Sequence, residues 1–393
     1  MLQASPYPTD FCSLLKKVHA IGAETIAPKA QEVDRDARFP REAFEALKAE
    51  KLLSAYVPPD YGGMGLSLIE LSKICETLGQ YCGSTAMIYA MHQIQVACIV
   101  HHALGSEYFR NYARELVARQ YLLASATTEL GIGGDLRSSL CAVKVEGERF
   151  TLVKQAPVIS YGEAADAILA TCRRAEDAAR GDQVQVLLLK EDYTLAQLAG
   201  WDTLGFRGTC SSGFTVTSTG RAEQILPAPY AAIHMKTMHP FSHVVWNSLW
   251  LGIASDALAR ARVTVRAEAR KNPGVTPISA TRLAEADIVL FSMRSALQAM
   301  IAEYDGRLVA GSEDNEPDSG FAIRTNNLKM ASSVQLIDVV SRAMIICGIA
   351  GYKNDSKLSL GRHLRDAYGA SVMVNNDRIL GHNSTMHIGQ RDA

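Results

Sequence analysis

The order of hydrophobic periodicities along the chain constrains its fold more than any other sequence feature. Up to about Val117, apolar residues recur at three- and four-residue spacing, as on the buried face of a helix. The clearest such face comprises Leu68, Leu71, Ile74, Cys75 and Leu78. Helical spacing returns after Ala231 and lasts to about Cys347. Because strand-like segments are confined to the middle, the chain is predicted to be a multidomain α+β protein.

The middle of the chain has the spacing of β-strands. The segment CAVKVEGERFTLV, Cys141 to Val153, alternates about a Glu-Gly turn and predicts a hairpin. The runs AILATC, QVQVLLL and FTVTST predict further strands. We therefore expect an N-terminal α-helical domain over residues 1–120, a central β-barrel or sandwich domain over 121–230, and a C-terminal helical bundle domain over 231–393.

Two segments rich in turn-forming or polar residues separate the predicted helices. VPPDYGGMG, Val57 to Gly65, predicts a connection, and GSEDNEPDSG, Gly311 to Gly320, predicts a solvated loop between long helices. The most apolar stretch, Ala86 to Leu104, contains three histidines and two glutamines. A membrane span needs ~20 predominantly apolar residues, so we expect a buried helix there and no membrane insertion.

Composition narrows the class of protein. Hydrophobic residues make up 48% of the 393 residues, enough for a large core, and 41 acidic residues nearly cancel 40 basic ones. No strong overall field therefore favours nucleic acid or an anionic membrane. Eight cysteines are scattered without CxxC pairs, and the N-terminus lacks a secretory pattern. We expect reduced thiols and a cytoplasmic location.

Two groups of histidines invite a metal interpretation: the pair His101 and His102, and the series His234, His239 and His243. No cysteine or carboxylate lies at ligand spacing with either group, so packing and surface roles are predicted and no metal site. The sequence also lacks a GxGxxG segment after a strand and a GxxxxGK[ST] segment.

A glycine-rich segment, TTELGIGGDLRSS from Thr127 to Ser139, lies where the first helical region meets the β region. Glycines allow backbone amides to approach a ligand closely, and a threonine hydroxyl beside them can bond a flat heterocycle. A surface turn would have the same composition, so this segment predicts a binding loop only if other segments agree.

Other segments do agree, in order along nearly the whole chain. TTELGIGGD resembles the TEPGAGSD segment of the acyl-CoA dehydrogenase family, PPDYGGMGLSLIE resembles its PEEYGGLG segment, and WDTLGFRGTCSSGF resembles its LGxRGT segment. KNPGVTPI, GIAGY and RHLRDA follow in the order of that family's C-terminal helices. The resemblance implies an acyl-CoA dehydrogenase-like fold whose C-terminal domain is a four-helix bundle, assembled as a homotetramer or homodimer.

The resemblance also implies FAD as cofactor and an acyl thioester, on CoA or a carrier protein, as substrate. In that family a carboxylate removes a proton from the α carbon while hydride leaves the β carbon for the flavin. The electrons then pass to an acceptor flavoprotein or, in some relatives, to oxygen. We therefore expect an FAD-dependent oxidoreductase.

Cofactor contacts carried over from the family are spread over the chain. Thr128 and Ser160 stand where relatives offer hydroxyls to the isoalloxazine, and Arg270 matches an arginine that meets the FAD pyrophosphate of a partner subunit. The full expected set is Ser125, Thr127, Thr128, Gly133, Gly134, Val158, Ser160, Arg270, Asn376 and Arg378. Departures from the family are Gly134 for serine, Val158 for tryptophan, Pro273 for phenylalanine, Asn376 for threonine, Arg378 for glutamine, Ile345 for glutamine and Ile349 for glycine.

The largest departure concerns the catalytic carboxylate. RDAYGASVMVNNDRIL, Arg365 to Leu380, aligns without a gap to the family's RDAxxxxIxEGTNEIL, and Val374 takes the glutamate's place. A second family arrangement puts the glutamate on the first bundle helix, where this chain has Ser242 or its neighbour His243. A positioned base is typically worth ~10²–10⁴-fold, so ordinary dehydrogenation should be impaired. The backbone N–H of Val374 remains to polarise a thioester carbonyl.

Three interpretations follow, with Val374, Ser242 and His243 expected to contact substrate in the catalytic ones. In the first, His243 is the base, with Asp377 as the second candidate, although a lone histidine among apolar neighbours more often has a packing or surface role. In the second, the substrate is already acidic or enolic and the protein is an oxygenase or oxidase of specialised metabolism. In the third, it is a non-catalytic FAD-binding paralogue.

Overall fold

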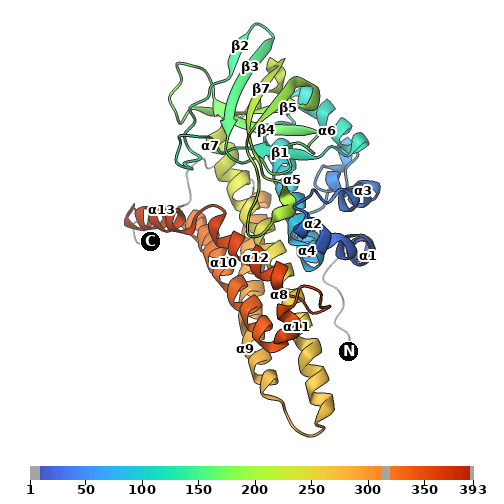
Figure 1. The fold of residues 1–393 in the computed structure, drawn as a ribbon. Coiled ribbons are helices and arrows are strands. Elements are labelled where there is room, and N and C mark those ends of the chain that lie inside the picture. Colours follow the sequence, from blue (N-terminus) through green and yellow to red (C-terminus); the bar gives the residue numbers. More distant parts are fainter. Residues whose placement is uncertain (1–8, 311–318, 390–393) are drawn as a thin grey trace.

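The computed structural model of the chain describes residues 9–310 and 319–389, and the predicted loop at Gly311 to Gly320 lies largely outside them. The N-terminal part is helical (Figure 1). Its helices are α1 (Thr9–Ile21), α2 (Ala27–Arg35), α3 (Arg41–Ala49), α4 (Leu68–Tyr81), α5 (Gly83–His102) and α6 (Glu107–Arg119), with short turns η1 (Gly22–Ile26), η2 (Leu52–Ser54) and η3 (Pro59–Tyr61).

The two helices predicted most directly from the sequence are α4 and α5. Ser67 caps α4 through a capping box with Glu70, and the predicted apolar face of α4 is buried, with no member more than 1% exposed. Two polar side chains of α5 are buried against backbone carbonyls: His92 donates to that of Leu53 (2.7 Å) and Gln93 to that of Leu52 (3.0 Å). The prediction of a buried helix here is confirmed from Ala86 to Ile99, where every residue except Met91 is buried.

The middle of the chain forms two sheets. Their strands are β1 (Leu123–Ala126), β2 (Lys144–Glu146), β3 (Arg149–Ala156), β4 (Ala167–Arg173), β5 (Gln183–Leu189), β6 (Tyr193–Ala199) and β7 (Gly213–Arg221). One sheet has the order β1-β4-β5 and the other β2-β3-β7-β6. The predicted hairpin is the β2–β3 pair, whereas β1 pairs with β4 in parallel. Isolated bridges outside the named strands, such as Ala142 with Arg173, extend the pairing.

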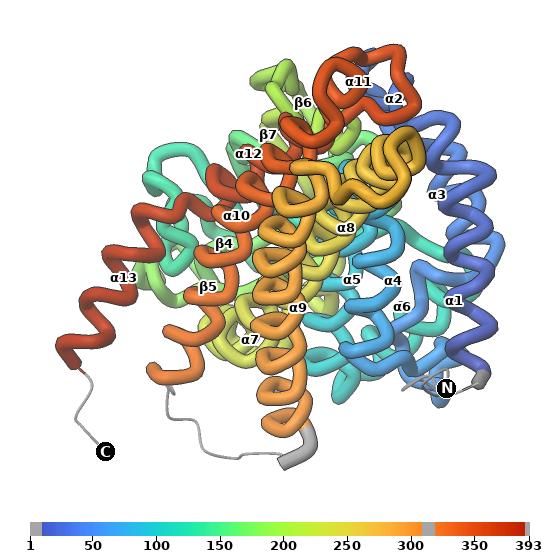
Figure 2. Tube along the Cα trace, turned by 90° about the horizontal axis from the view of Figure 1, so that it is seen from below, coloured from blue at the N-terminus to red at the C-terminus, as the bar shows by residue number. Residues whose placement is uncertain are grey.

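The C-terminal part is a helical bundle. Its elements are α7 (Tyr230–Ile233), the π-helical turn η7 (His234–Met238), α8 (His239–Lys271), α9 (Ile278–Ala310), α10 (Ser319–Cys347), α11 (Ile349–Tyr352), α12 (Gly361–Val372) and α13 (Asn376–Gly389). Figure 2 shows α9 and α10 on one side of α8 and α4 and α5 on the other, while α13 extends away from the bundle. Helices, sheets and bundle thus follow in the predicted order, and the fold prediction is confirmed.

Two segments that carry the family resemblance meet where the three parts join. The carboxylate of Asp366, in α12, accepts a hydrogen bond of 2.6 Å from the backbone N–H of Phe206. The neighbouring Arg365 pairs with Asp34 of α2. A Cβ on Gly205 would lie 2.3 Å from the carbonyl oxygen of Arg365, so only glycine allows this approach. Burial raises the pKa of Asp366 to about 6.

The helix α10 has the length and apolar composition of a membrane span, and it is alone in this among the described residues. Its polar side chains nevertheless lie inside the bundle: Asn326, Lys329 and Ser333 are all at most 4% exposed. These side chains form part of the site described below.

Candidate active site

The glycine-rich segment forms a loop whose base is held by a buried carboxylate. We call residues 127–139 the Gly loop. Glu129, 7% exposed, accepts hydrogen bonds from the Ser139 hydroxyl (2.5 Å) and the Cys141 N–H (2.6 Å), and it pairs with the buried Lys154 ammonium at 3.2 Å. Burial opposes ionisation, but the hydroxyl, the ammonium and the backbone donors outweigh it and hold the pKa of Glu129 below its usual value. The base of the loop is therefore tied to strand β3.

The expected hydroxyl groups lie along the edge of this loop. The hydroxyls of Ser125 and Thr127 are 2.8 Å apart, and the Thr128 hydroxyl donates to the carbonyl of Val158 at 3.3 Å. The Ser160 hydroxyl accepts a hydrogen bond of 2.8 Å from Ser211. The fold thus brings together two segments expected to contact the cofactor, the Gly loop and residues 158–160.

The residues at this edge fit a flat flavin ring. A Cβ on Gly133 would have no neighbour within 4 Å, so bare backbone borders open space here. Two apolar side chains are exposed beside the hydroxyls, Leu130 at 44% and Val158 at 36%. An aromatic heterocycle would cover this apolar surface and find hydrogen-bond partners in the hydroxyls and the backbone. The donor set therefore suits FAD, the expected cofactor.

Gly134 and Arg378, two departures from the family pattern, contact one another. The guanidinium of Arg378, from α13, donates to the carbonyl oxygens of Gly133 and Gly134. A Cβ on Gly134 would lie 2.2 Å from a guanidinium nitrogen of Arg378, and Gly134 also has a positive φ of 78°. The positive φ favours glycine at 134, and the lack of a Cβ there leaves room for the guanidinium of Arg378. This contact ties the Gly loop to the segment that follows Val374.

Val374 lies in a tight turn between α12 and α13. We call residues 373–376 the 374 turn. Val374 has a positive φ of 48°, which is unusual for a β-branched residue, and it is 37% exposed. Its carbonyl oxygen accepts a hydrogen bond of 3.0 Å from the ammonium of Lys329, which also donates to the Asn376 side-chain oxygen at 2.6 Å. The Asn376 amide donates in turn to the Ser333 hydroxyl (3.1 Å).

Lys329 is fully buried on α10, and burial lowers its pKa to about 8. It is one of the site residues that sequence reasoning missed. A signal was present, because Thr325, Lys329, Ser332 and Ser333 are spaced as one face of a helix and all are buried.

His243 is 2% exposed in α8 and belongs to a stack of imidazoles. Its ring centroid is 4.4 Å from that of His239, which is 5.6 Å from that of His234. The Nδ1 of His243 donates to the carbonyl of His239 at 2.8 Å, since a carbonyl can only accept. The Nε2 is then an unprotonated nitrogen, and it has no partner among the described residues. Burial, then the neighbouring His239, lower the pKa of His243 well below its usual value.

Asparagines extend this stack toward the C-terminal helix, a second feature that the sequence did not indicate. His239 Nε2 donates to the Asn326 side-chain oxygen (2.8 Å), and the Asn326 amide donates to Asn383 of α13 (2.7 Å). Ser242, at the alternative glutamate position, donates to the carbonyl of His239 (2.8 Å) and is 4% exposed. Its hydroxyl supplies no base.

The structure gives two of the candidate side chains no hydrogen bond to this group among the described residues. Arg270 is exposed in the last turn of α8, at the opposite end of that helix from His243. Asp377, the second candidate base, is exposed in the first turn of α13. Within the described part of one subunit, the structure gives neither side chain a hydrogen bond to the Gly loop.

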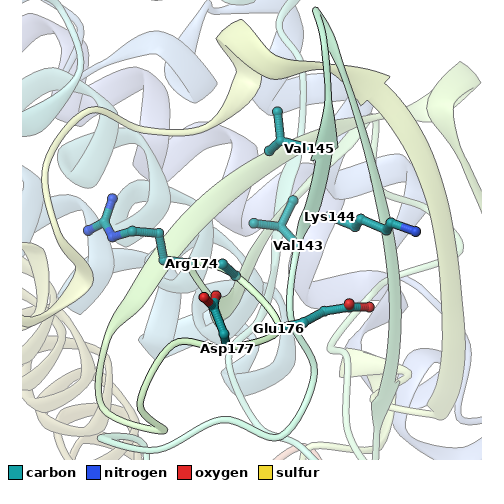
Figure 3. Close-up of a pocket in the computed structure, with 7 residues that line it drawn as sticks. Val143, Lys144, Val145, Arg174, Glu176 and Asp177 are labelled. Carbon is teal, nitrogen blue, oxygen red and sulfur yellow. The ribbon is translucent and has the colours of Figure 1, made fainter.

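A surface depression of about 350 Å³ lies elsewhere, at the edge of the β part (Figure 3). It is lined by Val143, Lys144, Val145, Arg174, Ala175, Glu176 and Asp177. Figure 3 shows Lys144 and Arg174 pointing in opposite directions rather than toward one ligand. None of the expected site residues lines it, so we do not assign the chemistry to this depression.

Comparison with known proteins agrees with this geometry. Residues 10–121 match the family described as acyl-CoA dehydrogenase, N-terminal domain. The chain is 25% identical over 375 residues to cyclohex-1-ene-1-carbonyl-CoA dehydrogenase of Geobacter metallireducens, covering 93% of this chain and 94% of that protein.

Solved structures share the whole fold. Butyryl-CoA dehydrogenase of Megasphaera elsdenii has a TM-score of 0.82 at 20% identity, over 98% of this chain and all of that one. FMN-bound TdsC of Paenibacillus sp. A11-2, described in another structure as dibenzothiophene monooxygenase, has a TM-score of 0.84 at 17% identity, over 97% and 98% of the two chains.

Proposed function

We propose that this chain, an acyl-CoA dehydrogenase-like protein in sequence and fold, is an FAD-dependent oxidoreductase that acts on the α and β carbons of an acyl thioester on CoA or a carrier protein. One observation carries the proposal: Arg378 joins the Gly loop to the 374 turn. The expected cofactor edge and the expected substrate turn are thereby held next to one another, as chemistry between a flavin and a thioester requires.

The residues of this site would have separate roles. FAD, when bound, would accept the electrons. Thr128, Ser160 and the backbone of Gly133 would hold its ring, and the Val374 N–H would polarise the thioester carbonyl. The chain's own contribution is therefore orientation and electrostatic polarisation, with His243 as the candidate base.

The proposal is tested by mixing the purified protein with FAD and a panel of acyl thioesters without oxygen. A yellow protein whose flavin absorbance falls only when a thioester is added supports it. A colourless protein that does not bind FAD would contradict the proposal and favour a non-catalytic paralogue.

His243 is the candidate base because its Nε2 has no hydrogen-bond partner among the described residues. His243→Ala should lower the rate of thioester-dependent flavin bleaching by roughly 10²-fold or more, since general-base catalysis is worth at least that much. His101→Ala is the matched control: His101 contacts Tyr56 (2.8 Å), outside the site. Unchanged bleaching in His243→Ala would end this assignment and leave the histidine a packing role.

A second function, oxygenation or oxidation of an acyl thioester, is favoured by one observation. Val374 cannot accept a proton, so a substrate that needs no strong base suits this site better than a saturated acyl chain. The similarity to a monooxygenase structure supports the same alternative. Oxygen uptake coupled to product formation, in the absence of any acceptor flavoprotein, separates the two: no uptake with any thioester rejects the oxygenase.

We also propose assembly into a homotetramer or homodimer in the cytoplasm. Large apolar side chains are exposed along the bundle, among them Ile288 and Phe291 (both 69%) in α9 and Ile345 (63%) in α10. Arg270 is exposed and so free to reach a neighbouring subunit. A sedimentation measurement that finds a monomer would contradict the proposed assembly. Recovery of the protein from a membrane or secreted fraction would contradict the proposed location.

A further inference from the structure

Lys329 is a buried positive charge whose hydrogen-bond partners in the described structure are neutral. Its side chain is 0% exposed, and the two hydrogen-bond acceptors that the structure gives it, a backbone carbonyl and an amide oxygen, are neutral. Within the described residues no carboxylate pairs with it. Burying an unpaired charge costs several kcal/mol, so an isolated buried ammonium points to a functional role more than to a stabilising one.

The position of this charge is specific. Lys329 contacts the 374 turn on both sides of its centre, at the carbonyl of Val374 and the side chain of Asn376. The neighbouring histidines are kept neutral by burial and add no negative charge. A carboxylate at position 374 would have been a natural partner for this ammonium. With valine there, the ammonium of Lys329 is the charged group that contacts the 374 turn in the described structure.

We propose that Lys329 is a positioning residue that makes the 374 turn stabilise negative charge on the carbonyl oxygen of a bound thioester, and that the substrates are thioesters whose α proton is acidic enough for them to bind as enolates, such as those with an electron-withdrawing substituent on the α carbon. This inference rests on the proposed function. It assigns the site a different task from proton removal by a carboxylate. The Val374 N–H holds the oxygen on which charge develops, and the Lys329 ammonium, bound to the carbonyl of the same residue, fixes the turn and adds positive charge nearby.

The consequence for the substrate is an ionisation. The α carbon loses its proton to water or to a neutral base such as His243, and the electron pair becomes the enolate. Fixed positive charge close to the thioester oxygen favours the anion. The ammonium form of Lys329 prevails at neutral pH, since its pKa is about 8. An aliphatic residue at 374 is consistent with this chemistry. A glutamate there would place a second negative charge beside the enolate and oppose its formation.

The test uses acetoacetyl-CoA as probe, bound to the FAD-loaded protein at neutral pH. The fraction bound as enolate is measured from the near-ultraviolet difference spectrum. Wild-type protein should hold a larger enolate fraction than free probe. Lys329→Gln, which keeps a donor for the Val374 carbonyl but removes the charge, should lower the bound enolate-to-keto ratio by roughly 10–100-fold. Lys329→Arg should retain most of it.

Asn376→Asp supplies an independent variant, because it places a carboxylate where an oxygen now lies 2.6 Å from the ammonium. It should lower the enolate ratio as Lys329→Gln does, and it keeps the proposal testable if the latter fails to fold. Lys353→Gln, at an exposed lysine, is the control for net charge.

Three results would overturn the proposal: equal enolate ratios in wild type, Lys329→Gln and Asn376→Asp; loss in folded Lys329→Arg as severe as in Lys329→Gln; or a wild-type ratio no higher than that of free probe. In each, probe binding itself persists and the proposed function stands. Failure of wild-type protein to bind any thioester would instead remove the proposed function, and this inference with it.

Discussion

Val374→Glu is expected to accelerate flavin reduction by a saturated acyl thioester by roughly 10²–10⁴-fold, the usual contribution of a positioned base. The side chain at 374 is 37% exposed in a turn tied to the Gly loop through Arg378. The substitution also removes a β-branched side chain from a backbone with a φ of 48°, so we expect no loss of stability from the backbone conformation. The measurement is single-turnover bleaching of the flavin without oxygen, with butyryl-CoA as substrate.

Lys329 sets the expected size of this gain. A new carboxylate near its ammonium will have a lowered pKa and be a weaker base, so the gain should fall toward the lower end of the range. Val374→Gln matches the new side chain in size and lacks its charge. If Val374→Gln accelerates bleaching as much as Val374→Glu, the site does not place position 374 against the reacting carbon.

How far the sequence predicts this molecule depends on the range of the interactions involved. Helix α4 and the β2–β3 hairpin follow from local periodicity, and both form where that periodicity predicts them. Strand β1 has only four residues, too few to show alternation, and its parallel partner β4 lies about 40 residues away. Strand β6 faces solvent along most of its length, so it lacks the apolar pattern of a buried strand.

The candidate site shows the same limit more sharply. Segments of the Gly loop and the 374 turn are visible as motifs, but the contact of Gly134 with Arg378 joins residues 244 positions apart. Taken singly, each is a departure that weakens the family match; together they form one compatible pair. Lys329 reaches Val374 across 45 positions, and only the packing of α10 beneath the 374 turn reveals that a cation stands beside the missing carboxylate.

Lys154→Met is expected to destabilise the β part of the protein by ~3–5 kcal/mol, the typical cost of breaking a buried ion pair from one side. Lys154 and Glu129 have side chains only 1% and 5% exposed, and Lys154 also donates to the carbonyl of Thr171 at 2.7 Å. Removing the ammonium leaves the carboxylate buried without its counter-charge. Urea unfolding followed by circular dichroism measures the loss.

Arg174→Met is the matched control in the same part of the chain. Its partner is Asp182 at 3.0 Å, but both side chains are nearly half exposed, so the expected loss is at most ~1 kcal/mol. The double variant Glu129→Gln with Lys154→Met should lose less than Lys154→Met alone, since it removes the unpaired charge. Equal losses in Lys154→Met and Arg174→Met would show that the buried pair contributes no more than a surface one.

Low pH should weaken the contacts that hold the base of the Gly loop. The pKa of Glu129 is lower in the folded protein than in the unfolded chain, so its ionisation favours the fold at pH values above the unfolded pKa. That contribution declines as the pH falls toward the folded pKa and is lost below it, where the carboxyl is protonated in both states. Because Glu129 fixes the base of the Gly loop, FAD affinity should fall in this window before the helices unfold, and in Lys154→Met it should begin to fall at a higher pH. A flavin that stays bound until global unfolding would show that the Gly loop does not depend on this carboxylate.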